Sequence, residues 1–172
     1  MLMQVLTPLQ CPALMSVMRT KLSLQQLYAP DSSCFGCGPK NDHGLGINSY
    51  AVGETVIATF TPKPFHQACD GVLNGGIIGT LLDCHCNWAA SHFLMHATGL
   101  DTPPCTVTAD YHIKLLRPCP GDQCLALKAT LSGIHGNKAI TEGLIAINDK
   151  VFATCKGTFV AVKEGHPAFH RW

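Results

Sequence analysis

One long apolar segment, together with the strand-like segments that follow it, limits the folds open to this chain. The apolar segment, about residues 74–96, has the composition of a buried helix and ends before Gly99 and Pro103. Strand-like segments precede it at residues 47–52 and 55–60 and follow it at residues 105–118, 123–134, 139–148 and 151–162. Turn sequences of hairpin length link the four that follow it. A long helix followed by an antiparallel meander predicts an α+β fold, in which a five- to six-stranded sheet wraps a central helix.

Residues 105–118 show the clearest strand pattern, because two sets of side chains alternate along the segment. The first set is Val107, Ala109, Tyr111, Ile113 and Leu115, and the second is Thr106, Thr108, Asp110, His112 and Lys114. Such a period of two is typical of a strand with one buried face. We therefore expect these two sets to lie on opposite faces of the sheet.

Composition excludes several classes of protein. Hydrophobic residues make up 47% of the 172 residues and charged residues only 13%, which indicates a folded, core-rich chain. The net charge of +1 provides no electrostatic reason to bind nucleic acid or a membrane surface. No apolar run reaches the roughly 18 to 20 residues of a membrane span. Nucleic-acid and membrane partners are therefore not expected.

The chain is expected to form one main domain with short additions. We predict a helical lead-in at residues 1–30, the domain at residues 31–165 and a tail at residues 166–172. The first basic residue is Arg19, so the lead-in lacks the basic region of a secretion signal. The ten cysteines are scattered through core-like segments, and most are interpreted as reduced side chains of a cytoplasmic protein.

Asn74, Gly75 and Gly76 stand where the predicted helix begins. Asparagine is a favoured N-cap, whereas each glycine costs a helix about 1 kcal/mol relative to alanine. Two glycines leave the first free N–H groups open at the positive end of the helix dipole, where a carbonyl oxygen becoming an oxyanion would be stabilised. The alternative is a tight turn into the helix with close packing.

Apart from the titratable His85, Asp83 is the only ionisable acid or base side chain other than cysteine in the run from Gly71 to Ala90. It follows Gly75 by eight residues, or about 12 Å along a helix. The two can act on one substrate only if they come from different subunits, with helices antiparallel across a two-fold axis. Asn87, four residues further on, would share the Asp83 face. The alternative is a buried Asp83 paired with a neighbouring cation, which could be His85, His112 or Lys114.

Three stretches of the chain carry a family resemblance that spans about residues 34–163. They are FHQACDGVLNGGIIGTLLDCHCNWAA, TVTADYHIKLLRPCPGDQ and KVFATCKGTFVAVK. The chain resembles the hotdog-fold acyl-CoA thioesterases of the phenylacetate-pathway (PaaI-like) type. Their pattern is H-x-N-x-x-G-x-x-H-G-G, with an acidic residue eight positions after the first glycine of the pair.

The resemblance implies a hotdog fold, a homodimer or a dimer of dimers, and hydrolysis of a thioester. Gly75 would supply the oxyanion N–H, and Asp83 of the facing subunit would act as base or nucleophile. No cofactor is implied, because coenzyme A is part of the substrate. Gly76 and Asn87 are further candidates for substrate contact. We expect a pH–rate profile with a single acid limb controlled by a carboxylate.

Two positions depart from the family pattern. His66 and Gly71 match it, but Ala68 replaces its Asn and Asn74 replaces the His before the glycine pair. Because Ala68 cannot hydrogen-bond a substrate, His66 or Gln67 would have to do so. The Asn74 amide could still polarise the thioester carbonyl or orient a water molecule.

Other polar residues have simpler interpretations. Arg117 and Lys138 are candidates for contact with the coenzyme A phosphates. Cys34 and Cys37 form a C-x-x-C motif with His43 downstream, but zinc needs four ligands and no second pair follows at suitable spacing, so no metal site is expected. The remaining histidines of the predicted helix are interpreted as surface or interface residues, and they are His85, His92 and His96.

Two alternative functions stay open on sequence grounds. A hotdog hydratase or dehydratase would pair His66 with Asp83 on the carbons of a hydroxyacyl thioester. A non-catalytic acyl-CoA-binding module would explain the replaced polar positions Ala68 and Asn74. Release of free thiol from acyl-CoAs distinguishes hydrolysis from both.

Overall fold

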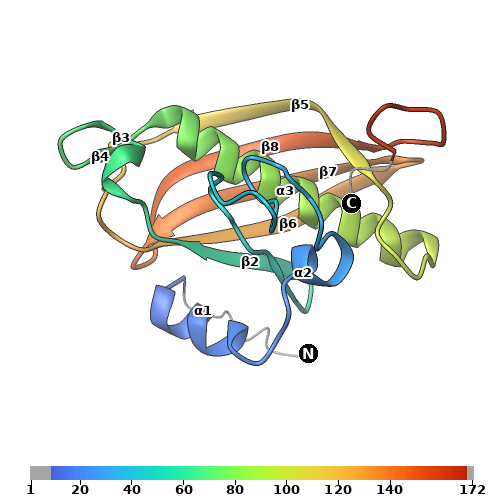
Figure 1. The fold of residues 1–172 in the computed structure, drawn as a ribbon, viewed down its shortest axis with the longest axis horizontal. Helices are drawn as coiled ribbons and strands as arrows, with labels where there is room; N and C mark the ends of the chain where they lie inside the picture. Colours follow the sequence, from blue (N-terminus) through green and yellow to red (C-terminus); the bar gives the residue numbers. More distant parts are fainter. Residues whose placement is uncertain (1–8, 170–172) are drawn as a thin grey trace.

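A six-stranded antiparallel sheet and one long helix make up most of the molecule (Figure 1). The computed structural model describes residues 9–169. The strands lie in the order β1-β2-β6-β7-β8-β5, and they are β1 (Tyr50–Val52), β2 (Thr55–Phe60), β5 (Thr106–Leu115), β6 (Leu125–His135), β7 (Lys138–Ile147) and β8 (Lys150–Ala161). All neighbours in this sheet are antiparallel. The predicted α+β hotdog arrangement is confirmed. The predicted meander is wrong at its first strand, because β5 pairs with β8 and β6 lies between β2 and β7.

The long helix α3 (Gly75–Thr98) lies across one face of the sheet (Figure 1). Asn74 caps its beginning, and Gly99 ends it with a positive φ of 67°, a conformation that glycine adopts without strain. The helix therefore starts where the sequence predicts and extends two residues beyond the expected end. No helix within residues 9–169 is long and apolar enough to cross a membrane.

The core lies between α3 and the sheet. Its largest fully buried side chains include Trp88, Leu81 and Leu82 of the helix and Phe159 of β8. Burying each such side chain contributes about 1.5–3 kcal/mol. The helix also approaches the sheet closely at Gly143, where an added Cβ would lie only 2.4 Å from Cys86 Sγ. A side chain on Gly143 would push α3 away from β7.

Two short helices precede the sheet, α1 (Cys11–Met18) and α2 (Leu24–Tyr28). Leu14 and Met18 of α1 pack with Ile57 and Ala126, so α1 covers the face of β2 and β6 opposite α3. Leu24 of α2 joins the main core instead. Within the described part of the predicted lead-in, residues 11–18 and 24–28 are helical. Residues 1–8 of the lead-in and 170–172 of the tail lie outside the described residues.

A disulfide joins Cys11 of α1 to Cys124 at the beginning of β6. The other eight cysteines are free, as predicted for most of the ten, and this pair is the exception. The two residues are 113 positions apart, so only the fold brings them together. The bond fastens α1 to the sheet and closes a long loop of the chain.

A β-bulge in β5 changes which side chains face α3. The pairing of β5 with β8 shifts register between Thr108 and Asp110, which places one extra residue in β5. Before the bulge, Thr106 and Thr108 bond side chains of α3. After it, Ile113 and Leu115 lie closest to the glycines of that helix. The predicted alternation, with these threonines opposite Ile113 and Leu115, is therefore wrong across the bulge.

Candidate functional site

The N-terminus of α3 is open to solvent and is capped by its own asparagine. Asn74 has an extended backbone (φ −63°, ψ 133°), and its Oδ1 accepts the N–H of Gly76 at 2.7 Å. Gly75 is the first helical residue, so its N–H has no carbonyl acceptor within the helix. Asn74, Gly75 and Gly76 are all exposed. One backbone donor at the positive end of the dipole thus remains accessible to a ligand.

The glycines of α3 also allow close packing against β5. A Cβ added to Gly75 would lie 3.3 Å from Leu115 Cδ1, and one added to Gly79 would lie 3.6 Å from Ile113 Cδ1. The close-packing interpretation of Gly75 is therefore supported alongside the open N–H. The two roles are compatible, because the side-chain position faces β5 while the N–H points along the helix axis.

Asp83 is half-buried and bonded to the sheet. Its Oδ1 accepts the hydroxyl of Thr108 at 2.7 Å. A neutral hydroxyl donor holds the carboxylate in a fixed orientation without neutralising its charge. Thr108 was not singled out in the sequence, because only the fold brings β5 against this turn of α3. Among the cations considered as partners, His85 is engaged elsewhere, with Ser49 and the carbonyl of Val56.

Asn87 lies one turn beyond Asp83 on the same helix face, as predicted. Its side chain is buried, accepts the hydroxyl of Thr106 and donates weakly to Thr108 Oγ1 at 3.4 Å. Both of its polar groups therefore already have partners on β5. The amide links α3 to the strand and supports the threonine that holds Asp83. Its contact with substrate stays a prediction.

Gly75 and Asp83 of one chain do not meet. Gly75 approaches Leu115 at the end of β5, whereas Asp83 contacts Thr108 near its beginning. The helix consequently runs antiparallel to β5, with the two residues about 12 Å apart along its axis. This agrees with the separation expected from the sequence. A single chain therefore places the open Gly75 N–H at one end of β5 and the Asp83 carboxylate at the other.

His66 lies directly beside the start of α3. It ends the short helix η1 (Pro64–His66), and its carbonyl accepts the N–H of Asn74 at 3.0 Å. The ring is buried, stacks on Phe60 and accepts the Lys63 N–H at Nδ1. Burial, with a smaller contribution from the charge of Lys63, lowers the pKa of His66. The imidazole is therefore neutral near pH 7, and Nε2 carries its proton.

Gln67 belongs to the hairpin that leads into α3, formed by β3 (Gln67–Cys69) and β4 (Val72–Leu73). Its Oε1 accepts the N–H of Gly71 at 3.0 Å and so closes the hairpin turn. A Cβ on Gly121 would lie 2.8 Å from Gln67 Cγ, so the side chain is also packed tightly. The turn therefore occupies the Gln67 carbonyl oxygen, and its substrate role stays a prediction.

Arg117 and Lys138 are exposed and lie at opposite ends of the sheet. Lys138 pairs with Val160, which pairs with Val107 near the beginning of β5. Arg117 follows the end of the same strand, where its guanidinium lies 5.8 Å from the Phe152 ring centre. Eight strand residues separate the two ends, or about 25 Å. The two cations of one chain therefore cannot hold the same phosphate group, and only Arg117 lies at the Gly75 end.

The helix histidines differ in environment. His85 is completely buried, so its interpretation as a surface or interface residue is wrong. Its Nε2–H donates to the carbonyl of Val56 at 3.1 Å, and its Nδ1 accepts the hydroxyl of Ser49 at 2.9 Å. Burial lowers the pKa of His85 to about 4, although the Val56 bond opposes this. His96 is exposed, and His92 is half-buried.

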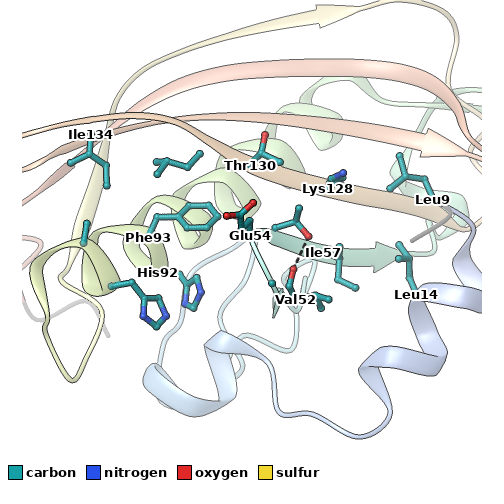
Figure 2. Close-up of a pocket in the computed structure, with 15 residues that line it drawn as sticks. Leu9, Leu14, Val52, Glu54, Ile57, His92, Phe93, Lys128, Thr130 and Ile134 are labelled. Carbon is teal, nitrogen blue, oxygen red and sulfur yellow. Dashed lines mark hydrogen bonds between the residues drawn. The ribbon is translucent and has the colours of Figure 1, made fainter. Parts of the chain in front are cut away.

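A groove of about 1040 Å³ has neither Gly75 nor Asp83 in its lining. Figure 2 shows the side chains that line it. Its walls come from α1, the β1–β2 turn, β6 and the C-terminal half of α3. They include Leu14, Glu54, His92, Phe93 and Thr130. The groove passes around the edge of the sheet instead of entering the space between α3 and β5. This groove therefore does not coincide with the residues proposed for catalysis.

Comparisons with known proteins identify a group of similar structures. No protein-family model and no curated protein matches the chain. The chain is 31% identical to a thioesterase superfamily protein of Shewanella loihica PV-4, with a TM-score of 0.60 over 73% of this chain and 98% of that one.

Two further solved structures are more distant in sequence. A thioesterase of Haemophilus influenzae has 22% identity and a TM-score of 0.60, over 71% of this chain and 84% of that one. A phenylacetic acid degradation-related protein of Ralstonia eutropha JMP134 has 20% identity and a TM-score of 0.57, over 68% and 86%. At these identities the two structures support the fold alone.

Proposed function

This chain belongs to the thioesterase superfamily, and from that premise we propose that it hydrolyses the thioester of an acyl-coenzyme A. The products are a carboxylic acid and free coenzyme A. The observation that carries the proposal is the arrangement of α3 along β5, with an open N–H at one end of the strand and an oriented carboxylate at the other. The reaction needs both groups at one carbonyl, and a second copy of the chain would supply the missing one.

The free edge of β5 is the surface through which such a pair would form. Within residues 9–169 β5 has a strand on one side only, which is β8. Tyr111 and Leu115 on this strand are 48% and 56% exposed. An unpaired edge with exposed apolar side chains favours pairing with another strand. We expect two copies of β5 to pair antiparallel across a two-fold axis.

Antiparallel pairing completes the site by geometry. If two copies of β5 pair near Tyr111, Leu115 of one copy comes opposite the beginning of the other, where Thr108 holds Asp83. Because Gly75 lies beside Leu115, the two-fold axis brings Gly75 of one subunit towards the partner's Asp83. Two equivalent sites result, each composed of both chains. The partner's Lys138 would come to the same end as Arg117, where both could meet phosphates.

The proposed chemistry uses few groups. The Gly75 N–H, aided by the Asn74 amide, would stabilise negative charge on the thioester oxygen. The carboxylate of Asp83 would either remove a proton from an attacking water or attack the carbonyl carbon itself. In both cases the C–S bond breaks and the coenzyme A thiolate takes up a proton. Direct attack would leave a mixed anhydride on Asp83, which water would then hydrolyse to regenerate the carboxylate.

The assay is a panel of acyl-CoAs with detection of free thiol, and separate detection of double-bond chemistry. Asp83→Asn keeps the size of the side chain and should lower kcat at least 100-fold, a typical loss for a catalytic group. Asp101→Asn, which changes an exposed carboxylate in the loop after α3, is the matched control and should keep wild-type turnover. Wild-type thiol release by Asp83→Asn would refute the assignment. Binding without turnover, or double-bond formation without thiol release, would refute hydrolysis itself.

A further inference from the structure

Three thiols from two remote parts of the sequence converge at the buried side of α3. Cys34 and Cys37 belong to one turn, and Cys84 lies on the helix, immediately after Asp83. The three Sγ atoms all lie within 4.8 Å of one another, and those of Cys34 and Cys84 are 3.8 Å apart. Cys37 and Cys84 are buried, while Cys34 is half-buried. The sequence contains no second C-x-x-C pair at suitable spacing for zinc, but the fold brings a third thiol to the first pair from the helix.

The backbone, more than side-chain flexibility, holds these thiols together. A Cβ on Gly36 would lie 2.4 Å from Cys84 Sγ, so the turn touches α3 with its main chain. The Gly38 N–H bonds the Cys34 carbonyl at 2.8 Å and closes the turn. The Ile47 N–H bonds the Gly36 carbonyl at 3.0 Å and ties the turn to the segment before β1. The site is therefore built before any ligand arrives.

The sulfur geometry suits a metal ion. A Zn²⁺–S bond is about 2.3 Å long, so two sulfurs of a tetrahedral site lie about 3.8 Å apart. The Cys34–Cys84 separation matches this value, and small rotations of Cys37 would bring its sulfur into range. Trp88 donates its indole N–H to Cys37 Sγ at 3.3 Å. Donors to ligand atoms of this kind orient metal ligands.

The cluster opens towards solvent on the Cys34 side, because Cys34 is half-buried whereas Cys37 and Cys84 are buried. A cation arriving from that side would displace the thiol protons of its ligands as it binds.

We propose that Cys34, Cys37 and Cys84 bind one thiophilic cation, of the class of Zn²⁺ or Cu⁺, which fastens the Cys34–Cys37 turn to α3 beside Asp83. Thiolates select these ions over Mg²⁺ and Ca²⁺. Three ligands suffice for trigonal Cu⁺, and Zn²⁺ would complete a tetrahedron with water on the exposed Cys34 side. Because Cys84 follows Asp83 directly, the ion would hold the helix turn that carries the carboxylate. The proposal concerns binding and stands whether or not the chain hydrolyses thioesters.

Metal titration of the full chain, with the free thiols reduced and counted, tests the proposal. Zn²⁺ is added in competition with a chromogenic chelator, and Cu⁺ in competition with a Cu⁺-selective chelator under anaerobic conditions. Co²⁺ is added as a spectroscopic probe of thiolate ligation. We expect one equivalent of Zn²⁺ or Cu⁺ to bind, a thiolate-to-cobalt charge-transfer band, and a higher unfolding temperature with the bound ion. The ion for which the protein competes more strongly with the chelator is the ion that the site prefers.

Variants separate this site from adventitious thiol binding. Cys34→Ser changes the half-buried ligand and carries the least risk to folding, while Cys84→Ser changes the helix ligand. Each should lose binding, the charge-transfer band and the thermal shift. Cys69→Ser changes an exposed free cysteine outside the cluster and should keep all three. Failure of the reduced protein to bind either ion, or binding that survives in Cys34→Ser and Cys84→Ser alike, would overturn the proposal.

Discussion

Acidification from pH 7 to pH 5 should destabilise the fold through His85. This imidazole is fully buried and neutral, with one nitrogen donating to the Val56 carbonyl and the other accepting the Ser49 hydroxyl. Ser49 in turn accepts the Gln25 side-chain amide at 3.2 Å, so the network is satisfied only while Nδ1 lacks a proton. Protonation would remove an acceptor and place an uncompensated charge in the core.

The size of the effect follows from the two pKa values of His85, about 4 in the folded state against 6.5 as the ordinary value. Between these values the unfolded chain binds a proton that the folded chain does not, so stability falls as the pH falls. The loss from pH 7 to pH 5 is about 2 kcal/mol, and the total loss below pH 4 approaches about 3 kcal/mol. Above pH 7 this contribution is constant.

Urea unfolding at pH 7, 6 and 5 measures the effect directly. The wild type should lose stability along this series. His85→Gln, which replaces the imidazole by an amide that can still hydrogen-bond but cannot titrate, should lose about 2 kcal/mol less than the wild type between pH 7 and 5. His135→Gln changes an exposed histidine of β6 and should follow the wild type. Equal pH dependence in the wild type and His85→Gln would refute the assignment, whatever the absolute stability of the variant.

Three further predictions concern the site and its supports. Asn74→Ala removes the helix cap and should lower the free energy of unfolding by about 1 kcal/mol. Asn74→Ser should keep the cap but lose thiol release. Full activity in Asn74→Ser would show that Asn74 serves only as a cap. Thr108→Val removes the hydroxyl donor to Asp83 and should lower kcat about 10-fold or more, whereas Thr108→Ser keeps the hydroxyl and should retain kcat. An unchanged kcat in Thr108→Val would show that Asp83 needs no orienting hydrogen bond. Replacing Cys11 and Cys124 together by serine should lower the free energy of unfolding by about 2–5 kcal/mol in chemical denaturation, and unchanged stability would mean that α1 is held by packing alone.

The sequence predicts the elements of this fold well, because hydrophobic period and turn residues are local signals. The helix beginning at Asn74 and the sequence of strands along the chain follow from them. These signals do not reveal that β5 pairs with β8 instead of β6. The bulge in β5 cannot be predicted from the sequence, because the two sets of side chains in residues 105–118 alternate without a break where the extra residue lies. Only the pairing with β8 reveals that Thr108 and Ile113 share the helix side, and the same shift gives Asp83 its bonding partner.

Contacts between distant segments account for the other differences. His85 is buried because the segment before β1 and the strand β2 cover a helix face that, in the sequence alone, has nothing opposite it. Ten cysteines allow many possible pairs, and their spacing along the chain does not identify Cys11 and Cys124 as the pair that forms a disulfide. Cys84 joins Cys34 and Cys37 only when the glycine-rich turn docks on α3.

Subunit complementation tests the central claim, that one site takes Gly75 from one chain and Asp83 from the other. Gly75→Pro removes the N–H, and proline is tolerated at the first position of a helix. It should lower kcat about 100- to 1000-fold, as loss of one oxyanion donor does. Gly75→Pro and Asp83→Asn are each inactive alone and are then refolded together, so that mixed dimers form. Random pairing makes about half of the dimers mixed, and one of the two sites in each mixed dimer is intact. The mixture should therefore recover about one quarter of wild-type thiol release. Mixed dimers that form but release no more thiol than the separate variants would contradict a site shared between subunits.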